Sequence, residues 1–174
     1  MNKNLIFKIS DLLEQSTGTS EQYSFDIPVE FPEISARSNL KGKIDIMRME
    51  KGLNVVVSGA TILADAKCEK CLKNFDENVE IPAAERQFYI NRPSRVDDPL
   101  DLFLIDKQNM TIDVNEMIRQ EIILHFPINS VCSTHCKGIC AYCGTDKNKK
   151  ACRCTEEEPE ENKPLSALKD LLKN

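Results

Sequence analysis

The distribution of cysteine is the feature that most constrains how this chain of 174 residues can fold. Of the eight cysteines, six lie close together, at positions 132, 136, 140, 143, 152 and 154. The same stretch has few large apolar side chains, chiefly Val131, Ile139 and Tyr142, so it cannot build a hydrophobic core of its own. Something other than apolar burial must therefore hold it in one conformation.

The cysteine spacing predicts metal thiolate sites rather than disulfides. The apolar run 5–7 is cut off by Lys8 and is too short for a secretory signal, so we expect a reducing, cytoplasmic location, where disulfides are rare. Cys68 and Cys71 form a CxxC pair, and structural zinc takes four thiolates, so eight cysteines divide most simply into two zinc sites. We expect the first site to contain Cys68, Cys71, Cys132 and Cys136, and the second, ribbon-like site to contain Cys140, Cys143, Cys152 and Cys154.

Other chemistry remains open for these residues. A dithiol redox site at Cys68 and Cys71 would need a lowered thiolate pKa. An iron–sulfur cluster has suitable ligands, although none of the ferredoxin spacings occurs. His135 lies between two cysteines and could replace one of them as a ligand, whereas His125 follows an apolar run and is expected to pack or cap at a helix end.

The first half of the chain predicts an α+β fold dominated by an antiparallel sheet, barrel-like or sandwich. The segments 44–46 and 55–57 are β-branched and are separated by Glu50-Lys51-Gly52, which is typical of a hairpin turn. Further strand-like segments are 23–29, 60–66, 79–81 and 87–90. The prolines at 28, 32 and 82 fit strand ends or sheet edges.

One helix is expected near 113–125, where it would pack on the sheet. Asp113 and Glu116 predict an acidic variant of the capping box, and Pro127 predicts the stop. The expected organisation is a sheet-rich domain over 1–128, a cysteine-rich zinc module over 129–155, and an acidic linker with a short C-terminal helix over 156–174. The leucines of that tail suggest a docking face.

Charge limits the partners that the chain can bind. The net charge is −5, so no overall basic field attracts nucleic acid. Locally, however, the second cysteine region is basic and has only Asp146 as an acid. Its cations could offset the thiolate charge or contact RNA phosphates. They are Lys137, Lys147, Lys149, Lys150 and Arg153. No apolar run of about 20 residues occurs, so we expect no membrane span.

No catalytic constellation emerges from the sequence. Only two histidines are present, there is no phosphate-cradling glycine motif, and a metal with four thiolates has no open position for water or substrate. We therefore expect no enzymatic activity.

The cysteine pattern also carries a resemblance to a known family. Cys68-Glu-Lys-Cys71-Leu72, the string Cys136-Lys-Gly-Ile-Cys140-Ala-Tyr-Cys143-Gly144 and the final Cys152-Arg-Cys154 are similar to the YceD family of bacterial large-ribosomal-RNA accumulation proteins, as are the segments 115–127 and 164–171. The resemblance implies a non-enzymatic factor for synthesis, processing or accumulation of large-subunit ribosomal RNA. It would scaffold a ribosomal protein or a pre-ribosomal particle. The alternatives are a zinc-ribbon nucleic-acid-binding regulator and a thiol redox enzyme or nuclease.

Overall fold

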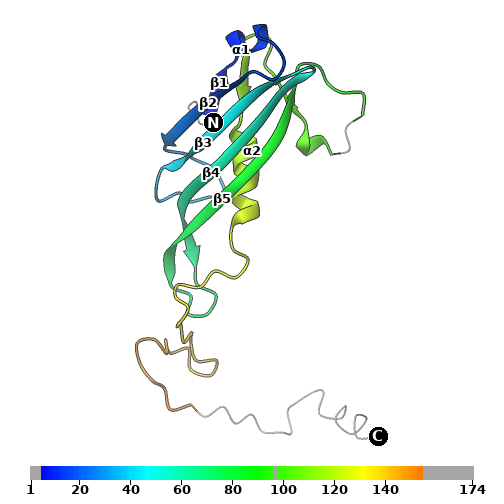
Figure 1. Cartoon of the computed structure of the whole chain (residues 1–174). Helices are drawn as coiled ribbons and strands as arrows, with labels where there is room; N and C mark the ends of the chain where they lie inside the picture. Colours follow the sequence, from blue (N-terminus) through cyan, green and yellow to red (C-terminus); the bar gives the residue numbers. More distant parts are fainter. Residues whose placement is uncertain (1–4, 96–97, 155–174) are drawn as a thin grey trace, which may run out of the picture.

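The computed structural model of the chain describes residues 5–95 and 98–154, which are mostly sheet with two α-helices (Figure 1). The strands are β1 (Ile6–Lys8), β2 (Ser20–Ile27), β3 (Leu40–Met49), β4 (Gly52–Lys67), β5 (Asn74–Tyr89), β6 (Phe103–Leu104) and β7 (Thr111–Asp113). The helices are α1 (Ser10–Glu14), the 3-10 helix η2 (Pro99–Asp101) and α2 (Asn115–His125). The α+β class is confirmed, whereas α1, β1, β6 and β7 were not expected from the sequence.

The main sheet is mixed and open: the pairs β2–β3, β3–β4 and β4–β5 are antiparallel, but the predicted antiparallel, barrel-like or sandwich sheet is not confirmed in full. Its five strands run in the order β2-β3-β4-β5-β6, and the last pair, β5 with β6, is parallel. β1 and β7 form a separate two-stranded sheet. Among the described residues the edge strands β2 and β6 do not pair with each other, so the sheet is open. Helix α2 lies against β5, where a sandwich would place a second sheet.

Two long strands dominate the sheet and reach toward the cysteine region (Figure 1). The turn between β3 and β4 is confirmed, since Met49 pairs with Gly52 and leaves Glu50 and Lys51 as a two-residue loop. The predicted segments 55–57 and 60–66 form one strand, as do 79–81 and 87–90 apart from Ile90. Pro82 is tolerated within β5 because β6 pairs only with Phe88 and Tyr89, which leaves the edge beside Pro82 unpaired.

One face of the sheet forms the hydrophobic core with α2. Along β4 the buried side chains alternate, as at Leu53, Val55 and Val57, and they join the buried Met117 and Ile122 of α2 in a single cluster. Arg86 of β5 adds an ion pair 2.8 Å long to the buried Glu121 of α2. The prediction that the helix packs on the sheet is therefore confirmed.

The predicted capping box at the start of α2 is wrong. The helix begins at Asn115 without a side-chain cap, and Oδ1 of Asp113 instead accepts the backbone N–H of Asn115 in a turn before the helix. The Glu116 carboxylate does not reach back because Arg119 donates to both of its oxygens, and such charged hydrogen bonds are the stronger ones. The helix ends before Pro127, as expected.

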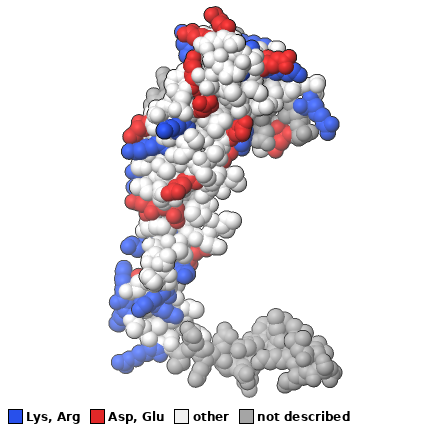
Figure 2. Space-filling view, viewed as in Figure 1, with Lys and Arg blue, Asp and Glu red and all other residues white. Residues whose placement is uncertain are grey.

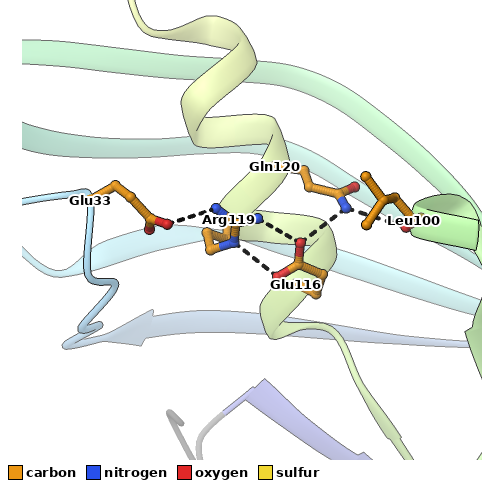
Figure 3. A network of polar contacts seen from close by, with 5 residues as sticks. All are labelled: Glu33, Leu100, Glu116, Arg119 and Gln120. Carbon is orange, nitrogen blue, oxygen red and sulfur yellow. Dashed lines mark hydrogen bonds and ion pairs between the residues drawn. The ribbon is translucent and has the colours of Figure 1, made fainter.

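A polar network on the outer side of α2 ties the helix to two loops (Figure 3). Arg119 bridges Glu116 on its own helix and Glu33 in the loop between β2 and β3, and Gln120 donates to the carbonyl oxygen of Leu100 in η2. These contacts hold α2 in place along the sheet, with its C-terminal end directed toward the cysteine region.

The predicted three-part division of the chain stays a prediction. The acidic linker and the C-terminal helix expected over 156–174 lie outside the described residues.

Candidate metal centres

The first CxxC pair forms the connection between the two longest strands. Residues 68–73 join β4 to β5, and the strand pairing ends at Lys67 with Asn74. Within this loop, the N–H of Cys68 donates to the carbonyl oxygen of Lys73 at 2.9 Å, and the N–H of Leu72 donates to that of Cys68 at 2.8 Å. The tight turn places the side chains of Cys68 and Cys71 at the end of the sheet.

A second loop repeats this backbone pattern. The N–H of Cys140 donates to the carbonyl oxygen of Thr145, and the N–H of Gly144 donates to that of Cys140, both at 2.9 Å. An antiparallel bridge between Ile139 and Asp146 flanks the loop. The two CxxC loops, residues 68–73 and 140–145, therefore share one backbone hydrogen-bond pattern although they are far apart in the sequence. We call each of these loops a knuckle.

The fifth residue of each knuckle has a left-handed backbone conformation. Glycine adopts this conformation without strain, whereas leucine adopts it only with strain. Its φ is 70° at Gly144 and 62° at Leu72. The Leu72 side chain is about half exposed, so it contributes little packing to offset the strain.

Leu72→Gly is therefore expected to raise the free energy of unfolding by about 0.5 to 1 kcal/mol, since relief of left-handed strain outweighs the entropy that glycine adds to the unfolded chain. Denaturant titration of the metal-loaded protein measures the change. The matched substitution Gly144→Ala should lower stability by a similar amount. A loss of stability in Leu72→Gly would show that the side chain packs more than its exposure indicates.

The structure brings Cys132 and Cys136 to the first knuckle. After α2 the chain runs to the end of the β4–β5 hairpin, where the N–H of Glu69 donates to the carbonyl oxygen of Ser130 and that of Ile139 donates to Lys70. Gly138 sits so close that a Cβ atom there would lie 2.9 Å from the Lys70 oxygen. This close approach, together with a φ of 72°, explains why glycine occupies position 138.

The four sulfurs of this first group fit a tetrahedral metal ion. The Sγ atoms lie 3.8 Å apart for Cys68 and Cys136 and 3.6 Å apart for Cys71 and Cys132. Metal–sulfur bonds of about 2.3 Å give a tetrahedron with edges of about 3.8 Å, whereas a disulfide would require about 2.05 Å. Cys68, Cys71 and Cys136 are buried in a small apolar cluster, separate from the main core, that also contains Phe75 and Val131.

The second group of cysteines has similar spacing but a more exposed setting. Cys140, Cys143, Cys152 and Cys154 have Sγ atoms that all lie within 4.8 Å of one another, as do those of the first group. Only Cys140 is buried, while Cys143 and Cys154 are exposed. Each group could hold one metal ion, and the two groups are the partition expected from the sequence.

Electrostatics within the groups favours a bound cation. Backbone N–H groups, that of Cys132 above all, lower the pKa of Cys68 to about 6. In contrast, the neighbouring sulfur of Cys71 raises the pKa of Cys132 to about 12. The second group behaves alike: Thr145 lowers the pKa of Cys143 to about 6, and Cys143 raises that of Cys154 to about 12. Some thiolates are supported, but four together repel one another unless a cation lies between them.

The structure also places the residues considered as alternatives. His135 is exposed and lies outside both cysteine groups. His125 is the last residue of α2, and its Nδ1 lies 2.9 Å from the carbonyl oxygen of Glu121, so its expected position at a helix end is confirmed. Asn148 was missed: its amide nitrogen donates to Sγ of Cys136 at 3.4 Å and to Asp146. Its distance from Cys136 in the sequence gives no signal for this contact.

A hairpin-tip knuckle completed by two cysteines from beyond a helix, with a second four-cysteine group beside it, defines a small α+β protein with two potential metal thiolate centres. The family model for "Large ribosomal RNA subunit accumulation protein YceD" matches residues 60–172, which include β5, α2 and both cysteine groups. The chain therefore belongs to the YceD family.

Two curated plant proteins are similar to part of the chain. Both are described as "Large ribosomal RNA subunit accumulation protein YCED homolog 1, chloroplastic". The Arabidopsis thaliana protein is 36% identical over 62 residues, which cover 35% of this chain and 19% of the relative. The Zea mays protein is 36% identical over 78 residues, which cover 44% of this chain and 25% of the relative. The matches thus span a quarter or less of the relatives' length, and no solved structure matches the chain.

Among the described residues, no helix has both the length and the apolar character needed to cross a lipid bilayer.

Proposed function

We propose that this protein is a non-enzymatic factor for the accumulation or processing of large-subunit ribosomal RNA and for ribosome assembly, with two structural zinc ions. The observation that carries the proposal is the family match over 60–172, because the printed family name refers to that RNA. Its partner would be a ribosomal protein or a pre-ribosomal particle. A cytoplasmic location stays a prediction, since the similar plant proteins are named as chloroplastic.

The geometry supports a structural role for the metals. A zinc ion with four thiolates has no open coordination position, so it supplies stability and not catalysis. The first ion would be held by Cys68, Cys71, Cys132 and Cys136 and would join positions 61 residues apart in the sequence, such as Cys71 and Cys132. The second would be held by Cys140, Cys143, Cys152 and Cys154 and would close only a local loop.

Deletion of the gene is expected to lower mature large-subunit ribosomal RNA relative to small-subunit RNA. The reason is that loss of an assembly factor for the large subunit lowers the yield of that subunit and not of the small one. The ratio is measured on total RNA, and particles are resolved by sedimentation. Reintroduction of the intact gene is the control. An unchanged ratio with a normal particle profile would remove the proposal.

A zinc-ribbon nucleic-acid-binding regulator is the second candidate, favoured by the lysines around the second cysteine group. The same sedimentation experiment separates the two. An assembly factor should migrate with precursor particles of the large subunit, whereas a regulator should be found away from ribosomal particles.

A further inference from the structure

Lysines from two distant parts of the sequence meet at the metal centres. Lys70 and Lys73 come from the first knuckle, while Lys137, Lys149, Lys150 and Arg153 come from the second cysteine region, and all six are exposed. The backbone contacts of Lys70 with Gly138 and Ile139 bring the sets together. We name these six residues the basic collar. Figure 2 shows basic residues gathered at this end of the described chain.

Two acids, Glu69 and Asp146, lie within the segments that supply the six cations of the basic collar. Hydrogen bonds from Asn148 and, to a smaller extent, the charges of Lys149 and Lys73 lower the pKa of Asp146, so lysines of the two sets lie near the same carboxylate. No ion pair within 4.0 Å engages any collar residue in the part of the chain that the structure describes. By contrast, exposed acids such as Asp76 and Glu80 follow along β5. This separation of charge would direct a polyanion to the knuckles.

An exposed aromatic ring lies within the same region. Tyr142 is at the third position of the second knuckle, and more than half of its surface is exposed. Ile139 beside it is also partly exposed. Protein surfaces that combine cations with an exposed aromatic ring are suited to unpaired bases, which can stack on the ring while cations contact the phosphates.

We infer that the basic collar with Tyr142 is a binding surface for single-stranded RNA. This inference rests on the proposed function and specifies its contact with RNA. Lysines and the arginine neutralise phosphates without reading sequence, and the Tyr142 ring stacks on one base. A duplex offers no free base face to that ring, so single strands are preferred. The first metal group assembles the surface, because it joins Lys70 and Lys73 to the remaining collar residues.

The experiment compares two triple variants of the full, zinc-loaded chain. Lys70→Gln/Lys137→Gln/Lys149→Gln removes three collar charges. Lys41→Gln/Lys51→Gln/Lys107→Gln removes three exposed charges elsewhere on the described surface and is the matched control. Fluorescence anisotropy measures binding to a mixed-sequence single-stranded RNA of about a dozen nucleotides and to the same RNA in a duplex, at several salt concentrations.

The collar variant should bind every sequence more weakly, and the slope of log affinity against log salt should become shallower by about 2, since each single-strand phosphate contributes about 0.7. Tyr142→Ala should weaken single-strand binding about 5-fold to 150-fold, and Tyr142→Phe should not. Equal losses in the two triple variants, or equal binding of duplex with no effect of Tyr142→Ala, would overturn the inference.

Two further readouts separate this inference from the proposed function. If the collar variant restores ribosomal RNA in the deletion strain as well as the intact gene does, the surface is wrong while the proposed function stands. If the collar variant binds RNA normally but no longer sediments with ribosomal particles, the collar contacts a protein and the RNA assignment is overturned. Equal zinc content of all variants confirms that each is folded at its metal groups.

Discussion

Cys68→Ser is expected to release one of two zinc ions and to lower the free energy of unfolding by on the order of 4 kcal/mol, the stabilisation that a ligand gives at a thousand times its dissociation constant. The effect is large because the first group joins the β4–β5 hairpin to the segment after α2. Loss of the metal ion removes the link between positions that are 61 residues apart in the sequence, such as Cys71 and Cys132, and so frees a long loop. Native mass spectrometry counts the zinc, and urea titration measures stability.

The second cysteine group supplies the matched control. Cys143→Ser should also release one zinc ion but leave the sheet largely folded, because that group closes a local loop. The double variant Cys68→Ser/Cys132→Ser should cost little more than Cys68→Ser, since both residues belong to one group. If it loses two zinc ions while Cys68→Ser/Cys143→Ser loses one, the grouping is wrong. Bound iron with a visible charge-transfer spectrum would favour the cluster alternative.

Glu121→Ala is expected to lower the free energy of unfolding by about 2 to 4 kcal/mol. Glu121 is only 5% exposed and forms an ion pair of 2.8 Å with Arg86, which is itself partly buried between β5 and α2. Removing the carboxylate takes away the acid that lies 2.8 Å from this poorly hydrated guanidinium. Urea titration of the zinc-loaded protein measures the loss.

A second acid on the same helix provides the comparison (Figure 3). Glu116 also pairs with an arginine, Arg119, at 2.7 Å, but its side chain is 47% exposed. Glu116→Ala should therefore cost less than about 1 kcal/mol. In addition, Arg86→Met/Glu121→Met should recover most of the stability lost in Glu121→Ala, because it replaces both charges of the pair with apolar side chains. Equal losses for the two glutamates would show that burial does not control the strength of these pairs.

The sequence alone was sufficient for features that depend on local chemistry. Segments rich in β-branched residues located the strands around Ile44, Val55 and Ile62, and Pro127 marked the end of α2, because side-chain shape and backbone restriction act over a few residues. The grouping of the eight cysteines was also predictable, since a four-thiolate site and the cysteine spacing leave few simple divisions.

Tertiary structure alone decided the features that depend on partners distant in sequence. The sheet is mixed because of β6, a two-residue strand too short to leave a sequence pattern, which pairs parallel with β5. Glu116 bound Arg119 instead of capping α2, because a cation within reach competes with a backbone N–H. Likewise, Lys70 and Lys73 join the basic collar only because the chain returns after α2 to the hairpin tip. Periodicity and spacing report local geometry, whereas these contacts arise when segments meet in space.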